Sequence, residues 1–277
     1  MTETQITPLL ETGFYRLVKG RHGRFLTNPR DTFIGRAVAT YGEYSELEFT
    51  LLAQLVGEGA VAIEVGANMG ALTVPLAKHL GPRGLLYALE PQPLVFQQLA
   101  ANLALNDLVN VAAMNMAAGS EAERIGIARV NPGADLNFGG VALDQVRDED
   151  QPFSVEVVRL DEAIDPSALS LIKIDVEGME SAVIEGAGGL ISRFRPILYL
   201  ECAEEGSDTL IAQILALGYK AWWHTPPLYN PDNYAGLAEN LFPRLVSINM
   251  LCLPEESGRE VAGLHAVTGP GDHPKRR

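Results

Sequence analysis

The sequence has few cysteines and no long apolar run among its 277 residues. Cys202 and Cys252 both lie within apolar, strand-like segments, so we expect two buried thiols in a reducing compartment and not a disulfide framework. No uninterrupted apolar stretch approaches the length of a membrane span. The first residues lack the basic and apolar parts of a secretory leader. These absences predict a soluble, cytoplasmic protein with no membrane partner.

Positive charge is also scarce. Lysine and arginine number 21 against 35 aspartates and glutamates, which gives a formal net charge of -14. Such an excess of acid argues against nonspecific binding to nucleic acid or to an anionic membrane. The chain is long enough for one large α/β domain with a well-buried core.

Apolar strands and helical segments alternate along the chain, which predicts a mostly parallel sheet covered on both faces. Strands are expected at 60–65, 85–89, 109–114, 170–175 and 197–202, and an antiparallel edge pair at 219–223 and 246–253. Helices are expected at 45–56, 69–80, 93–105, 178–186 and 208–217. We expect a helical or irregular cap over 1–56, the main domain over 57–254 and a flexible tail over 255–277. Ser45 and Glu48 fit a capping box at the start of the first helix.

A glycine-bearing turn follows the first strand, and an acid ends the second. Gly66 and Gly70 frame the turn, and Glu90 lies twenty residues further on, where an acid can accept from ribose hydroxyls. A dinucleotide site favours a glycine where this chain has Asn68. Glu64 would repel a pyrophosphate but suits the ammonium of an amino-acid ligand. The turn therefore favours S-adenosylmethionine over NAD and leaves an NAD-dependent oxidoreductase as the alternative.

Several strands end on a carboxylate or an amide. These residues are Glu64 and Asn68, Glu90, Asn115, Asp175 with Glu177, and Glu201. In an open α/β sheet, ligands bind outside the carboxyl ends of the strands. We therefore expect these side chains to form one acidic rim and an active site. The glycine-rich stretch 131–140 is expected to be a mobile cover.

The chain resembles the FkbM family of S-adenosylmethionine-dependent methyltransferases over about residues 40–254. The segments that carry the resemblance are Tyr41-Gly-Glu-Tyr-Ser-Glu46, Glu64-Val-Gly-Ala-Asn-Met-Gly70, Glu90-Pro-Gln-Pro93, Ile172-Lys-Ile-Asp-Val-Glu-Gly-Met-Glu180, Gly186-Ala187 and Trp223-His-Thr-Pro-Pro-Leu-Tyr-Asn-Pro-Asp-Asn233. The resemblance implies a Rossmann-like class I methyltransferase with a seven-stranded, mostly parallel sheet and an antiparallel edge hairpin.

The resemblance also implies roles for individual residues. The cofactor-binding set would be Glu64, Gly66, Ala67, Asn68 and Gly70 at the methionine end, Glu90 at the ribose and Asn115 at the adenine edge. Tyr41 and Glu46 either close over the amino-acid end or only cap and pack a helix.

Transfer of a methyl group to an alcohol benefits from a base that takes the proton. Asp175, Glu177 and His224 are the candidate catalytic residues, although a lone histidine in such a place is more often a structural hydrogen-bonding residue. A divalent cation held by Asp175 and Glu201 is a further hypothesis.

A small-molecule, natural-product or saccharide acceptor is expected against Trp223, Tyr229, Asn230 and Asn233. Trp222 and Trp223 alternate across their strand, so one of the two is expected in the core. The sequence thus predicts an O-methyltransferase and leaves open an amine or carbon nucleophile, or a catalytically silent S-adenosylmethionine-binding protein.

Overall fold

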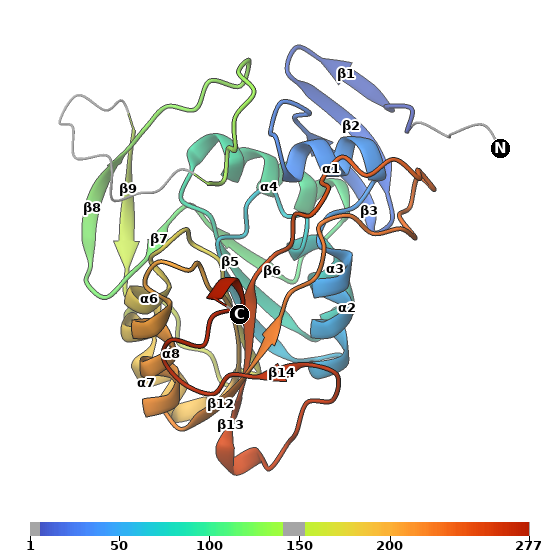
Figure 1. The fold of residues 1–277 in the computed structure, drawn as a ribbon. Coiled ribbons are helices and arrows are strands. Elements are labelled where there is room, and N and C mark those ends of the chain that lie inside the picture. The colour runs from blue at the N-terminus through green and yellow to red at the C-terminus, as the bar shows by residue number, and fades with distance from the viewer. Residues whose placement is uncertain (1–5, 141–152, 277) are drawn as a thin grey trace.

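The structure is a computed structural model that describes residues 6–140 and 153–276. Its centre is an eight-stranded sheet in the order β14-β12-β13-β11-β10-β4-β5-β6 (Figure 1). The parallel strands are β4 (Val61–Val65), β5 (Leu85–Leu89), β6 (Val111–Met114), β10 (Leu171–Ile174) and β11 (Ile197–Glu201). The antiparallel strands are β12 (Tyr219–His224), β13 (Asn249–Pro254) and β14 (His265–Ala266). The predicted Rossmann-like sheet with an antiparallel edge hairpin is confirmed, and β14 adds a short eighth strand.

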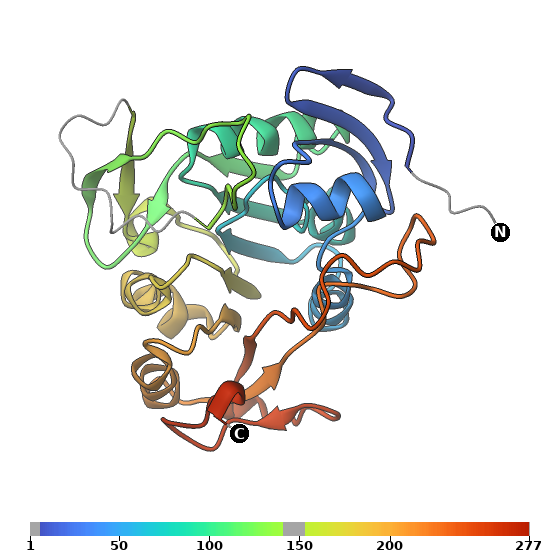
Figure 2. The same cartoon turned by 45° about the horizontal axis from the view of Figure 1, so that its top comes forward.

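Helices cover both faces of this sheet (Figures 1 and 2). One layer holds α2 (Glu46–Leu55), α3 (Thr73–Leu80) and α4 (Pro93–Leu105). The other holds α5 (Leu160–Ala163), α6 (Glu180–Gly186), α7 (Gly188–Phe194) and α8 (Ser207–Ala216). Side chains alternate across each strand, so Ala62 packs under the first layer and Ile63 under the second. Burial on both faces explains why these strands are nearly continuous apolar runs.

Two smaller sheets flank the main one. β1 (Leu10–Thr12), β2 (Tyr15–Gly20) and β3 (Gly23–Thr27) form an antiparallel sheet that is followed by α1 (Ile34–Tyr41). β7 (Ala117–Ala118), β9 (Phe153–Val158) and β8 (Glu123–Ile127) form the other. Where a helical or irregular cap was expected, the amino-terminal region thus contains a sheet. The Asn102 side chain pins it, because it accepts from the Leu26 N–H at 2.6 Å and donates to the Leu26 carbonyl at 3.2 Å.

The residues after 254 do not behave as the expected flexible tail. They form η2 (Glu255–Ser257), β14 and η3 (Pro274–Arg276), and β14 pairs with β12. His273 is fully buried: its Nε2 lies 3.0 Å from the Cys202 carbonyl oxygen, and its ring packs edge-on against Trp223. The sequence of this segment gave no sign of its packing. The segment is held by one buried ring, that of His273, and by the two residues of β14. Within the described ranges, no helix combines the length and apolarity needed to cross a bilayer.

Gly66 sets the distance between β4 and β10. A Cβ at this position would lie 1.8 Å from the Asp175 carbonyl oxygen, and the backbone φ is +82°. We predict that Gly66→Ala lowers the free energy of unfolding by about 3 kcal/mol, because overlap and left-handed strain add. Chemical denaturation would measure this. Gly57→Ala is the control, since an added Cβ there meets nothing within 4 Å, and its effect should stay within about 0.5 kcal/mol. Equal stability of the two variants would contradict the close approach.

Candidate active site

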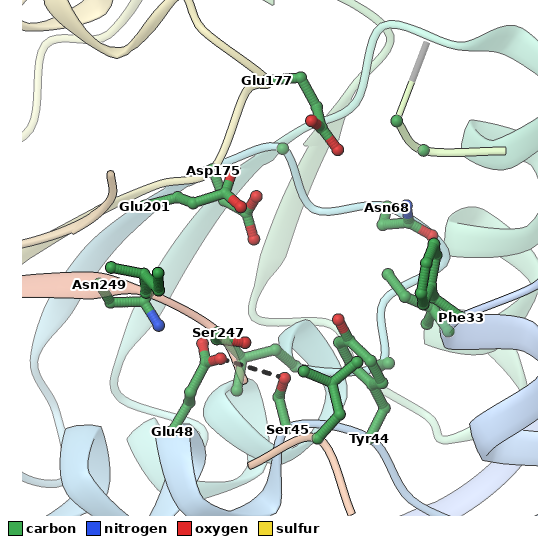
Figure 3. Close-up of a pocket in the computed structure, with 18 of the residues that line it drawn as sticks. Phe33, Tyr44, Ser45, Glu48, Asn68, Asp175, Glu177, Glu201, Ser247 and Asn249 are labelled. Atoms are coloured by element: carbon green, nitrogen blue, oxygen red, sulfur yellow. Dashed lines mark hydrogen bonds between the residues drawn. The ribbon is translucent and has the colours of Figure 1, made fainter. Parts of the chain in front are cut away.

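A cavity of about 450 Å³ lies at the carboxyl ends of β4, β10 and β11. In the sheet β5 lies on one side of β4 and β10 on the other, so the strand order reverses beside this cavity. Such a switch point is where open α/β sheets bind ligands. Figure 3 shows the acids at the ends of β10 and β11 facing residues of the α2 region and of the segment before β13. The acidic rim expected from the sequence is therefore assembled around one cavity.

The turn after β4 gives its backbone to the cavity. Gly66, Ala67 and Asn68 line it, and Asn68 has a left-handed φ of 49°. The Asn68 side chain accepts from the Met69 N–H at 2.7 Å, which holds the turn. The expected helix at 69–80 begins only at Thr73, because the turn extends through Gly70, with φ +87°.

Glu90 faces this turn from the end of β5. Its two carboxylate oxygens accept from the Asn68 N–H at 2.9 Å and the Gln92 N–H at 2.8 Å. Burial raises its pKa to about 7. Asn115 does not line the cavity but donates to the carbonyls of Glu90 and Pro91 at 2.8 and 2.9 Å. Asn115 therefore positions the β5–α4 link, and Glu90 keeps lone pairs for a ligand.

Glu64 is fully buried near the end of β4, and neither carboxylate oxygen makes a hydrogen bond of good geometry among the described residues, although the Thr73 hydroxyl lies within reach. The Lys173 ammonium lies 3.9 Å from one of them. Burial raises the pKa of Glu64 to about 7, and the lysine only partly offsets this effect. A buried carboxylate with free lone pairs beside a ligand cavity is suited to a group that donates hydrogen bonds.

Lys173 and Asp175 form a close ion pair at the end of β10, with 3.0 Å between Nζ and Oδ2. Although burial opposes ionisation, this ammonium lowers the pKa of Asp175. Glu201 shows the opposite shift: burial and the charge of Asp175 raise its pKa to about 10. At neutral pH, Asp175 is therefore ionised and its neighbour Glu201 carries a proton.

The structure does not support the hypothesis of a divalent cation on Asp175 and Glu201. Among the residues that the structure describes, no group of three or more His, Cys, Asp or Glu side chains is arranged to hold a metal ion. The Lys173 ammonium already supplies the positive charge beside Asp175, and a protonated Glu201 is a poor metal ligand.

Glu177 lies at the cavity edge on a strained turn. It has a φ of 51°, which is unusual outside glycine, and is followed by Gly178 at φ +95°. Glu177 is exposed and accepts no hydrogen bond from the described residues; partial desolvation at the cavity edge and the charge of Asp175 raise its pKa. Figure 3 shows its side chain directed toward the cavity between Asp175 and Asn68. Unlike Asp175, Glu177 has no ion-pair partner among the described residues that would hold its carboxylate in the ionised form.

His224 and Trp223 lie outside the cavity lining. His224 Nδ1 lies 2.8 Å from the Tyr199 hydroxyl, and burial lowers its pKa. Trp222 and Trp223 are both buried, the first under α2 and α3 and the second under the opposite layer. The prediction that only one of them is core understates the burial, because both faces of β12 are covered.

The other predicted site residues, Tyr41, Glu46, Tyr229, Asn230 and Asn233, make contacts away from the cavity. The Tyr41 hydroxyl donates to the Glu239 carbonyl at 2.8 Å, and its ring packs on Tyr229. Asn230 donates to Glu43 at 2.8 Å, while Asn233 caps the backbone of Leu237 within its own loop.

Glu46 completes this set through a contact with the amino-terminal sheet, 2.6 Å from His22. Tyr41, Glu46, Tyr229, Asn230 and Asn233 are therefore engaged by other parts of the chain and do not line the large cavity.

Several polar cavity residues were not singled out from the sequence as site residues. They include Lys173 on β10, Tyr44, Ser45 and Glu48 at the start of α2, and Ser247 and Asn249 at the start of β13. Ser45 does not form the expected capping box: it has a φ of 52°, and its hydroxyl donates to the Glu48 carboxylate at 3.3 Å. The motif Tyr41–Glu46 marked the right region, but the cavity takes the residues on the other side of that turn.

The glycine-rich stretch 131–140 covers the turn after β4. Asn137, Gly139 and Gly140 line the cavity, and a Cβ on Gly139 would lie 1.8 Å from the Asn68 amide nitrogen. Hydrogen bonds between Thr32 and Leu136, and between Leu136 and Arg30, fix this stretch against the segment before α1.

The chain is similar to several known proteins. A crystal structure of methyltransferase FkbM from Methylobacillus flagellatus KT is 20% identical, covers 81% of this chain and 48% of its own, and superposes with a TM-score of 0.49. A fibrillarin of Aeropyrum pernix with natively bound S-adenosyl-L-methionine is 13% identical over 90% of this chain and 97% of its own, with a TM-score of 0.44.

A curated relative, the tRNA(Phe) (4-demethylwyosine(37)-C(7)) aminocarboxypropyltransferase of Methanocaldococcus jannaschii, is 38% identical over 60 residues. The match spans 22% of this chain and 24% of that relative, so the chain covers about a quarter of the curated relative and about half of the FkbM structure. The family model of the methyltransferase FkbM domain matches residues 64–221, which is more than half of the chain. The chain belongs to the FkbM methyltransferase domain family.

Proposed function

We propose that this protein transfers a methyl group from S-adenosylmethionine to a hydroxyl of a small, uncharged acceptor. The observation that carries the proposal is the pair of buried carboxylates on either side of one glycine turn. Glu64 offers two unpartnered oxygens, which suit the ammonium of the cofactor. Glu90 retains lone pairs for ribose hydroxyls. The residues present therefore fit this cofactor.

The same carboxylates favour S-adenosylmethionine over NAD. A pyrophosphate beside Glu64 and Glu90 would place like charges together in a buried site. S-adenosylmethionine carries no phosphate, and it supplies an electrophilic methyl group on a sulfonium. The remaining task of the chain is to hold an acceptor oxygen and to remove its proton.

Glu177 is the residue that we assign to proton removal. A base works best when its pKa lies near the working pH. The pKa of Glu177 is raised, whereas that of Asp175 is lowered by Lys173 and Glu201 already holds a proton. Asp175 and Glu201 then act as a polar wall, with Lys173 fixing the orientation of Asp175.

The lining of the cavity supports a small, uncharged acceptor. Five glutamates and one aspartate line the cavity, against the three cations Lys173, Arg244 and Lys275. An acceptor with phosphates would enter against this field, as would a nucleic acid against a chain of net charge -14. The curated relative acts on tRNA, so a tRNA pool belongs in the acceptor tests as the arm that could overturn this part.

Glu90→Ala should weaken binding of S-adenosylhomocysteine at least 100-fold, because it removes the ribose acceptor and frees the Asn68 N–H from its partner. Isothermal titration calorimetry measures the affinity, with the exposed Glu58→Ala as the control. Tight binding by the Glu90 variant, or tight binding of NADH by the native protein, would overturn the cofactor assignment.

Binding of S-adenosylmethionine should release protons near neutral pH. The pKa values of Glu64 and Glu90 are both raised to about 7, so the free protein holds these protons below that pH. Because the ligand favours both ionised forms, its affinity should fall about 100-fold from pH 8 to pH 6, a factor of about ten from each carboxylate. Calorimetry in buffers of different ionisation enthalpy counts the protons. Glu64→Gln should reduce the number released, and an unchanged number would exclude Glu64 from the linkage.

Glu177→Gln should lower kcat by about 10² to 10⁴ and leave S-adenosylhomocysteine affinity unchanged, since it removes a base and no cofactor contact. The measurement uses an isotopically labelled methyl donor with a panel of hydroxyl acceptors. The acidic limb in the pH dependence of kcat, measured at saturating S-adenosylmethionine, should disappear in this variant. If His224→Gln abolished turnover and Glu177→Gln did not, the assignment of the base would be wrong.

A further inference from the structure

The cavity has a second polar wall, opposite the acids at the ends of β10 and β11. Glu48 comes from α2 and Asn249 from the start of β13, with the hydroxyls of Ser45 and Ser247 beside them. Figure 3 shows Glu48, Ser45 and Ser247 together across the cavity from Asp175, with Asn249 beside Glu201, its partner in the sheet. Glu48 and Asn249 both lie outside residues 64–221, the part matched by the family model.

Asn249 is built to meet a ligand. It is 3% exposed, and its Nδ2 makes no hydrogen bond of good geometry among the described residues, although the amide lies within reach of the Tyr199 hydroxyl. A buried amide nitrogen left without a partner loses its hydration and gains nothing in return, so such groups are rare. The nitrogen therefore calls for an acceptor atom, and the cavity is the space that can supply one.

Glu48 offers the complementary group. It is 5% exposed, accepts from the Ser45 hydroxyl at 3.3 Å and lies within hydrogen-bonding reach of the Ser247 and Tyr199 hydroxyls. A carboxylate has about four acceptor positions, so an acceptor position remains for a ligand. The left-handed φ of Ser45 places its hydroxyl against Glu48 and not against the helix backbone, and backbone strain of this kind tends to mark functional sites.

Only some ligand groups satisfy both residues. An ammonium donates to Glu48 but cannot accept from Asn249. An ionised phosphate or carboxylate accepts from Asn249 but has no hydrogen to donate to Glu48. A hydroxyl both donates and accepts, so two neighbouring hydroxyls can satisfy the two side chains together. Tyr44, whose hydroxyl is directed into the cavity, adds a ring against which a sugar face could pack (Figure 3).

We propose that Glu48 and Asn249 form an acceptor subsite that binds hydroxyls next to the one to be methylated, so that the substrate is a saccharide-like polyol. This inference rests on the proposed methyltransferase function and deepens it. It also places acceptor selection in the segments that flank the matched methyltransferase region, apart from the cofactor turn.

The test measures binding and turnover separately. Methyl glycosides of several hexoses and deoxyhexoses are added to the full-length protein with S-adenosylhomocysteine, and saturation-transfer NMR detects binding. A parallel panel of small primary amides serves as the competing ligand class, because an amide also donates and accepts. Glu48→Gln and Asn249→Leu are compared with the surface variants Glu58→Gln and Asn240→Leu. S-adenosylhomocysteine affinity and the circular dichroism spectrum of each variant report on the cofactor site and on folding.

We expect at least one glycoside to bind and to accept labelled methyl groups, with kcat/KM reduced at least tenfold in both cavity variants and unchanged in both surface variants. S-adenosylhomocysteine affinity should stay within twofold in all four. Binding of amides without glycosides would overturn the subsite, as would loss of S-adenosylhomocysteine affinity in a folded Glu48→Gln protein, which would make Glu48 a cofactor ligand. If the native protein does not bind S-adenosylhomocysteine, the proposed function itself fails and not the subsite alone.

Discussion

The site depends on one buried cation. Lys173 lies on β10, with its ammonium 3.0 Å from Asp175 and 3.9 Å from Glu64. Burial raises the pKa of Glu48, and the Lys173 ammonium offsets part of this rise. Burying several carboxylates without a counter-charge would cost several kcal/mol per ion, and the acids would take up protons instead. One ammonium shared among them lets some acids ionise while others stay neutral.

A second constraint links the start of α2 to the amino-terminal sheet and to the loop before β13. Glu43 is buried and accepts from Arg21 at 2.6 Å, from Asn230 at 2.8 Å and from the Tyr234 N–H at 2.7 Å. These contacts join the amino-terminal sheet, the start of α2 and the loop before β13. Ser45, which lines the cavity, follows Glu43 by two residues, so these contacts help to fix its position.

The sequence predicted the parts of the protein whose signal is local. Apolar runs that end on acids revealed β4, β5, β10 and β11 and placed Glu64, Glu90 and Asp175 on one rim. The turn at Gly66 and Asn68 was evident from its spacing. Contacts made across long sequence separations left no such signal. Tyr41 and Asn230 carry ordinary polar side chains, and only the fold shows that they serve the junction at Glu43. Asn249 opens an apolar strand, and only the fold shows that it is buried and paired with Glu201 of β11.

The distribution of charge suits the proposed reaction. Methyl transfer from a sulfonium to a hydroxyl destroys a positive charge, so unshielded negative charge at the reacting centre would stabilise the reactants more than the transition state. At the ends of β10 and β11, Asp175 is neutralised by Lys173, and Glu201 is neutral because it holds a proton. Glu64 and Glu90, which flank the glycine turn, have pKa values near 7 and can ionise when a cationic ligand arrives. The chain thus separates the acids suited to binding a cation from the region where its charge would be lost, and the raised pKa of Glu177 fits a base that ionises without a fixed counter-ion.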